Sequence, residues 1–177
     1  TLTSFLRLRD ELEETLQIYR SNKSRELAEK LQVINAQFQA LLDLSSVPQS
    51  LHNEIGTETT AYLLDILGRI KLPDLESVPD EDAFGDDASS AKWRIPGTPI
   101  RIVRVDEGGR EGEFLFSERT VVAAPRFYLA INDLPLQTSL PIISWQRAIP
   151  QITGPMIPAA VLRSVPQSLR DFWLDTP

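Results

Sequence analysis

Apolar residues recur at steps of three and four along the first 72 residues, and the period changes after residue 92. In the first part they form three stripes on otherwise polar helical wheels, which predicts helices over 2–19, 27–42 and 51–70. Three amphipathic helices with short connections are typical of an antiparallel bundle. The stripes consist of Leu2, Phe5, Leu6, Leu12, Leu16 and Tyr19; Leu27, Leu31, Ile34, Phe38, Leu41 and Leu42; and Leu51, Ile55, Tyr62, Leu63, Ile66, Leu67 and Ile70.

Two short signals mark the expected helix starts. Residues 21–24 indicate a turn with an N-cap before the second helix. Ser46 and Gln49 match the S-x-x-Q capping box before the third helix, with Pro48 in its first turn. The hexapeptide Ser-Val-Pro-Gln-Ser-Leu at 46–51 contains this box and recurs at 164–169, so we expect a further helix to start there.

After residue 92 the pattern is typical of strands. Residues 92–95 form a short candidate strand, and 100–105 and 112–116 form two more, joined by a Gly-Gly loop as in a β-hairpin. Phe114 and Phe116 share one face of the last strand, so we expect that face to be buried. Ser117 can open a helix that Pro125 would kink or shorten. Short helices are expected at 144–149 and beyond 158.

Proline and charge divide the chain at the same places. Pro48 is the one proline in residues 1–72, whereas the other 12 of the 13 prolines lie in residues 73–177. Residues 73–91 hold seven acidic residues and no basic one, which equals the net charge of −7. We therefore expect a helical unit over 1–72, an acidic linker or loop over 73–91, and a hairpin with short helices over 92–177. The two units pack as one domain of the α+β class, mainly α.

The composition of the chain excludes several kinds of functional site. The chain has no Cys and one His, which excludes disulfides, thiolate metal sites and sites with two imidazoles. Outside 73–91 the charges nearly cancel, which argues against nucleic-acid binding. No run reaches the ~18 consecutive apolar residues of a membrane span.

No motif indicates an enzyme. The acidic run 80–87 fails as a calcium loop because Phe84 and Ala91 occupy two of the ligand positions. The loop 108–112 lacks the Gly-Lys-Ser/Thr ending of a phosphate loop. His52 lies on a predicted helix with no serine elbow nearby. We expect neither catalysis nor a cofactor or metal.

Trp93, Arg94, Arg101 and Arg104 form an aromatic and cationic cluster around the predicted strands. This cluster is the candidate interaction surface, either for docking or for an anion. The alternative interpretation is an edge strand that charge protects from pairing with other chains.

Several stretches of the sequence together resemble a known protein family. They are Leu42–Ser45, Glu54–Gly56, Leu63–Ile70, Leu72–Pro73, Trp93–Thr98, Ile100–Val105, Gly112–Ser117, Thr120–Val121 and Gly154–Pro158. Together they resemble the N-terminal extension of bacterial mechanosensitive channels of the small-conductance family, most specifically over 93–117.

The resemblance implies a periplasmic or extracytoplasmic module, tethered to the inner membrane in the full-length protein. Its partner would be the membrane-channel part of its own chain, which is a homo-oligomer in that family. The fragment alone is expected to be a monomer with an accessory, sensing or assembly role. It carries no counterpart of the pore-lining residues, so we expect no ion conduction by it.

Two other functions remain open at this point. A small-ligand sensor would need a concave apolar pocket, expected near Trp93 and Arg101. A carboxylate-dependent hydrolase would need two acids from separate elements in a cleft, one with a raised pKa.

Overall fold

Helices make up most of the computed structural model, which describes residues 1–75, 92–137 and 144–148. A small antiparallel sheet completes it, so the predicted α+β class, mainly α, is confirmed. The elements in chain order are α1 (Leu2–Ser21), α2 (Arg25–Gln39), η1 (Gln49–Leu51), α3 (His52–Leu67), β1 (Lys92–Arg94), β2 (Arg101–Arg104), β3 (Phe114–Phe116), α4 (Glu118–Ile131) and α5 (Trp145–Ala148).

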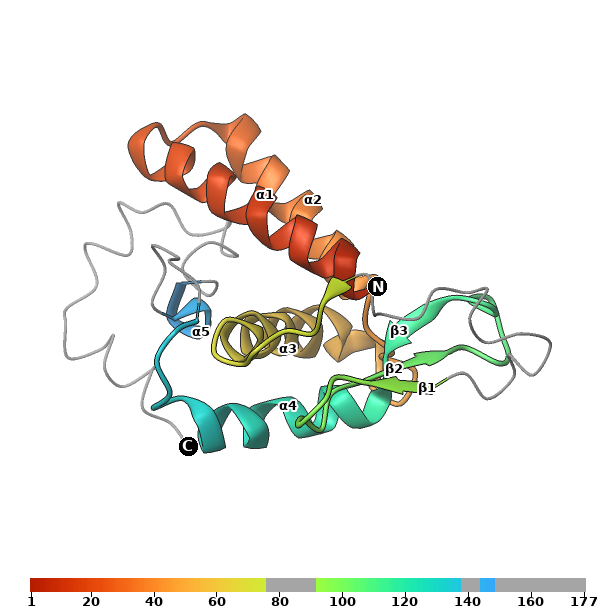
Figure 1. Cartoon of the computed structure of the whole chain (residues 1–177). Helices are drawn as coiled ribbons and strands as arrows, with labels where there is room; N and C mark the ends of the chain where they lie inside the picture. Colours follow the sequence, from red (N-terminus) through yellow and green to blue (C-terminus); the bar gives the residue numbers. More distant parts are fainter. Residues whose placement is uncertain (76–91, 138–143, 149–177) are drawn as a thin grey trace, which may run out of the picture.

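The helices α1 and α2 lie side by side as a helical hairpin, and α3 lies between this hairpin and α4 (Figure 1). The Ser24 hydroxyl accepts a hydrogen bond from the Leu27 amide at 3.2 Å, which caps α2 as its sequence predicts. Neighbours on several sides bury every residue from 63 to 69, so the end of α3 is buried all round rather than along one stripe.

The capping box predicted at Ser46 and Gln49 is not formed. A 3₁₀ turn, η1, comes first, and neither it nor α3 has a side-chain cap. The Leu51 amide donates to the Pro48 carbonyl at 2.8 Å, which is a backbone bond of this 3₁₀ turn.

The sheet has three strands in the order β1-β2-β3, one more than the hairpin. Gly108 and Gly112 in the connection from β2 to β3 have φ of 97° and 86°, which explains glycine at both positions. A parallel bridge between Leu42 and Phe116 adds the segment after α2 to the edge of β3.

The strand β3 is buried on the predicted face and also on the opposite face, which was not predicted. Phe116 is fully buried as predicted, but Leu115 on the opposite face is only 3% exposed, and Phe114 is half-buried. The segment after α2 explains the difference because Leu42 and Leu44 share a groove with Leu115.

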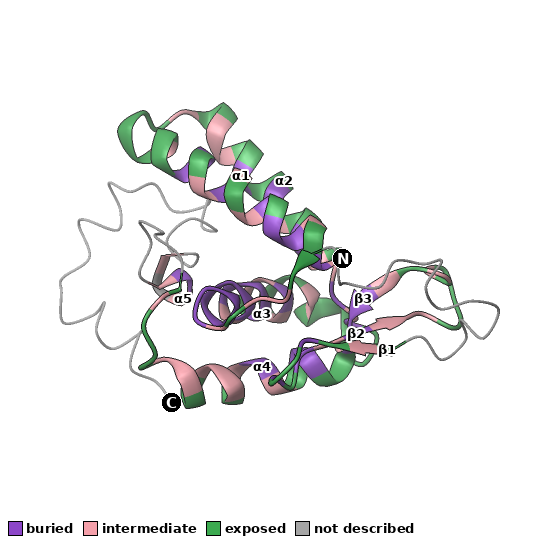
Figure 2. Cartoon of the chain, viewed as in Figure 1, coloured by how far each residue is buried: buried purple, intermediate pink, exposed green. Residues whose placement is uncertain are grey.

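Three aromatic rings join the sheet to the helical hairpin. Phe5 of α1 meets Phe38 of α2 edge to face at 4.8 Å between ring centroids, and meets Phe116 of β3 at 5.3 Å. Such contacts add to the free energy of burial. The buried residues gather where α1, α2, α3 and the sheet converge (Figure 2).

The helix α4 starts at the predicted place, with the Ser117 hydroxyl accepting from the Thr120 amide at 3.2 Å. Pro125 does not shorten it, since the helix runs on to Ile131. α5 confirms the short helix expected at 144–149, and Trp145 is 1% exposed. The acidic run within 76–91, the helices expected beyond 158 and the second capping box lie outside the described residues.

Candidate functional site

The sheet divides the four residues of the predicted interaction surface between its two faces. Trp93 pairs with Ile102 and Arg104 with Phe114, so both lie on the face that carries Phe116 into the core. Arg94 pairs with Arg101, and this pair lies on the opposite face. The structure therefore brings together only two of the four residues as an open surface.

The inner pair is held within the fold. Trp93 is half-buried and packs against the hydrophobic core. Arg104 is half-buried beside Gly112, and its Nη2 lies 3.5 Å from where a Cβ would stand at that glycine. Its Nε is buried without a hydrogen-bond partner. Arg104 thus fills the inside of the β2–β3 hairpin instead of an accessible docking surface.

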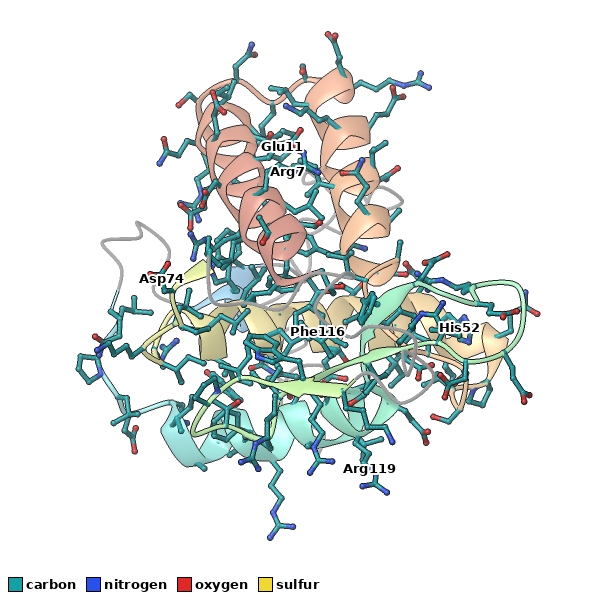
Figure 3. The ribbon with its side chains drawn as sticks, turned by 45° about the vertical axis from the view of Figure 1, so that its right-hand side comes forward. Arg7, Glu11, His52, Asp74, Phe116 and Arg119 are labelled. Carbon is teal, nitrogen blue, oxygen red and sulfur yellow. The ribbon has the colours of Figure 1, made fainter. Side chains whose placement is uncertain are left out.

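The outer pair, Arg94 and Arg101, places two like charges directly opposite each other on neighbouring strands. Cβ atoms in such pairs are about 5 Å apart, and like charges there are destabilising. The Thr120 hydroxyl fixes Arg101 against α4, because it accepts from the Arg101 amide at 2.8 Å and donates to its carbonyl at 3.0 Å. Arg119, the residue before Thr120, projects outward from α4 (Figure 3).

A groove of about 580 Å³ lies between the end of α2 and the β2–β3 loop. Arg110 lines this groove, donates to the carbonyls of Ala40 and Leu42, and pairs with Glu113 at 2.7 Å. His52 Nε2 lies 2.8 Å from the Val47 carbonyl. Both polar side chains therefore already serve the fold. The groove is not the pocket expected near Trp93 and Arg101, because neither residue lines it.

A buried carboxylate that the sequence interpretation missed holds α5 in place. Asp65 of α3 is fully buried, and its oxygens accept from the amides of Trp145 at 2.8 Å and Gln146 at 3.1 Å. The Ser144 hydroxyl donates to the same carboxylate at 3.2 Å. The signal was present, since Asp65 is the one charged residue in the run Leu63–Leu67.

Arg69 supplies the opposite charge to Asp65. Its Nη1 lies 3.5 Å from Asp65 Oδ1 and donates to the Asp65 carbonyl at 2.9 Å. Its Nε donates to the carbonyl of Asn132, just after α4. The pair thereby connects α3, α4 and α5, which is a structural role for a buried charge that is paired and hydrogen-bonded.

Among the described residues, the pKa values of two side chains are shifted. Burial raises the pKa of Glu13 above its ordinary value of 4.5, while Arg9 opposes the rise and Asp10 adds to it. Burial also raises the pKa of Tyr62, helped by Glu58, which accepts its hydroxyl at 3.1 Å. Glu13 and Asp10 belong to the same helix, so they are not the pair from separate elements that a carboxylate hydrolase would use.

Within the described ranges, no group of three or more His, Asp or Glu side chains is arranged to hold a metal ion. None of the helices in these ranges has the length and hydropathy to cross a bilayer. No protein-family model, curated protein or solved structure matches the chain.

Proposed function

We propose that this chain is the extracytoplasmic module of a mechanosensitive channel-like membrane protein of the small-conductance family. Its role there is accessory, in sensing, modulation or assembly, and involves neither catalysis nor conduction by these residues. Its partners are the channel part of its own full-length chain and the equivalent chains of a homo-oligomer, at the periplasmic side of the inner membrane.

One observation carries the proposal beyond the sequence likeness. The stretches that resemble the channel extension are far apart in the chain, yet backbone hydrogen bonds join them. The Asp43 amide donates to the Phe116 carbonyl at 2.9 Å, and the Phe116 amide donates at 2.9 Å to the carbonyl of Leu41, the residue just before the first stretch. The likeness therefore falls on segments that assemble around one core, which supports a single inherited module.

The Asp65 network supports the same proposal. It ties the resembling helix α3 to residues 144–146, which precede the last resembling stretch in the sequence. A module that influences a channel needs a firm connection between its body and the chain that leads onward. Asp65 supplies a connection of this kind.

The full-length gene tests the proposal. We expect its reading frame to continue beyond residue 177 into apolar segments of about 20 residues. Expressed in a bacterium without its own mechanosensitive channels, it should protect cells against sudden dilution and give tension-activated currents in patches. A version lacking residues 1–177 should keep the pore but change its threshold or its abundance. A reading frame without membrane segments would contradict the proposal.

The isolated chain offers a second check. Light scattering should give the mass of a monomer, because the channel parts are expected to hold the oligomer together. A reporter enzyme active only outside the cytoplasm, fused after residue 177 of the full-length protein, should be active. A reporter active only in the cytoplasm should be inactive at the same position.

A further inference from the structure

The outward side of α4 carries arginine and aliphatic residues in one stripe. Arg119, Val122, Arg126 and Leu129 recur at steps of three and four and are all exposed. The two aliphatic side chains are 71% and 69% exposed, the highest values among the large exposed hydrophobic residues described. Single exposed aliphatic residues are ordinary, but two between arginines on one helix face form a pattern.

The arginines of the sheet adjoin this stripe. Arg94 and Arg101 stand at the two ends of the turn from β1 to β2. That turn packs along a flank of α4, where Pro99 and Ile100 line a crevice with Thr120, Ala123, Ala124 and Phe127. We call Arg94, Arg101, Arg119, Val122, Arg126 and Leu129 the arginine–aliphatic face.

Among the residues that the structure describes, the arginines of this face have no acidic partner. Four other arginines of the described chain form ion pairs: Arg9 with Asp10, Arg25 with Glu29, Arg69 with Asp65 and Arg110 with Glu113. The four arginines of the arginine–aliphatic face form none within the described residues. Two of them are also held opposite each other, at a cost to stability. The face is therefore complementary to an external anionic surface.

We propose that the arginine–aliphatic face binds the surface of a bilayer that contains anionic phospholipids. Guanidinium groups bind phosphate in a bidentate manner. Aliphatic side chains on a helix crest enter the boundary between headgroups and acyl chains when the helix lies in the membrane plane. An acidic polypeptide would satisfy the arginines but would give Val122 and Leu129 no apolar environment.

This proposal does not depend on the channel assignment. Any membrane-associated protein could use such a face, and the experiment needs only the 177-residue chain and vesicles. If vesicle binding fails, the channel proposal is still decided by the full-length gene. If the channel proposal fails, membrane binding is still decided by vesicle flotation.

Vesicle flotation tests the binding. The chain should float with vesicles of phosphatidylcholine and phosphatidylglycerol in equal parts, and not with phosphatidylcholine alone. Binding should weaken with salt, because salt screens the attraction between the local positive charge of the face and the anionic headgroups. Floating equally with both vesicle types, or with neither, would overturn the proposal.

Matched variants locate the surface. The triple variant Arg94→Glu, Arg101→Glu, Arg119→Glu should lose at least about 100-fold in affinity, from roughly fivefold for each charge near the membrane. The control Arg7→Glu, Arg20→Glu, Lys23→Glu makes the same change of net charge on exposed positions of the helical hairpin. In Figure 3, Arg7 lies on the helical hairpin in the upper part of the molecule, whereas Arg119 lies at its lower edge. The control should lose far less, and an equal loss would overturn the proposal.

The aliphatic part has its own variant. The double variant Val122→Ser, Leu129→Ser leaves every charge in place. It should still weaken flotation severalfold, because it removes the two aliphatic side chains that would enter the membrane. Both side chains are exposed, so their removal leaves the core intact. Far-ultraviolet circular dichroism checks that each variant is folded. Polyglutamate provides the competing test. If the chain binds polyglutamate through these arginines but does not float with vesicles, the membrane proposal is wrong and an acidic protein partner is indicated.

Discussion

Two regions of the molecule treat charge in opposite ways. On α3, Asp65 and Arg69 lie within the core, and each of them is hydrogen-bonded to several groups. On the sheet, Arg94 and Arg101 face each other at the surface, without an acidic partner among the described residues. The first arrangement holds elements together, while the second opposes folding slightly and leaves charge for an external partner.

The contrast teaches which charges to examine for function. A buried charge with a full set of partners has its role explained by the fold. An exposed group of like charges has no such explanation, because separation or replacement would relieve the repulsion. The predictions that follow test this contrast from the larger effect to the smaller.

Removal of the Asp65 carboxylate should have the largest effect. Asp65→Leu takes the acceptor away from three donors of residues 144–146 and the counter-charge from buried Arg69. We expect a loss of about 3–5 kcal/mol in the free energy of unfolding, measured by urea denaturation. Asp65→Asn, which keeps the shape and one acceptor oxygen, should lose less.

Asp10, the exposed partner of the more buried Arg9, provides the control for that experiment. Asp10 is 67% exposed in its side chain, so Asp10→Ala should change the free energy of unfolding by less than about 1 kcal/mol. If Asp65→Leu also proved this mild, the view of Asp65 as the link between α3 and α5 would be wrong.

The junction of sheet and α4 should show an intermediate effect. Thr120→Val preserves the shape but leaves the amide and carbonyl of Arg101 without their hydroxyl partner. We expect a loss of about 1–3 kcal/mol. Thr120→Ser keeps the hydroxyl and should lose less, and equal losses in the two variants would assign the effect to packing instead.

Local pattern was enough to predict most elements of the fold. The stripes at steps of three and four located α1 and α2, and the β-branched runs around Gly108 located β2 and β3. Burial on both faces of β3 could not be read from the sequence. It depends on Leu42 and Leu44, which come from a segment about 70 residues earlier.

The candidate site was predicted only in part, for a different reason. Trp93 and Arg94 are neighbours in the sequence, but successive residues of a strand point to opposite faces. Pairing register then placed Arg94 with Arg101 and Arg104 with Phe114. The partners of Asp65 were equally hidden, because they lie about 80 residues further along the chain.

A charge reversal on the sheet tests the other side of the contrast. Arg94→Glu converts the repulsive pair with Arg101 into an attractive one. It should raise the free energy of unfolding by about 0.2–1 kcal/mol, and salt should reduce the gain. The same variant should bind anionic vesicles more weakly. A stabilised variant with weaker binding would show that the repulsion serves the surface, whereas a destabilised variant would contradict the assigned register.

Glu13 is partly buried, so its surroundings are intermediate between those of the buried Asp65 and those of Arg94 at the surface. Its replacement should have the smallest effect on stability. Burial raises its pKa in the folded state, and its Oε1 has no hydrogen-bond partner. An acid with a raised pKa in the folded state binds its proton more tightly there than in the unfolded chain. Its contribution therefore favours folding at low pH and is lost as the pH rises through the raised pKa.

Glu13→Gln should consequently stabilise the protein at neutral pH, because it removes a charge that burial disfavours. The gain should shrink as the pH falls through the raised pKa of Glu13, and it should be lost below the ordinary value of 4.5, where the carboxyl is protonated in both the folded and the unfolded chain. Thermal unfolding of both proteins from neutral to acidic pH measures the difference. Glu14→Gln on the exposed side of α1 is the matched control, for which we expect a smaller difference. A gain that is independent of pH would show that the effect of Glu13→Gln comes from helix propensity instead of the burial of charge.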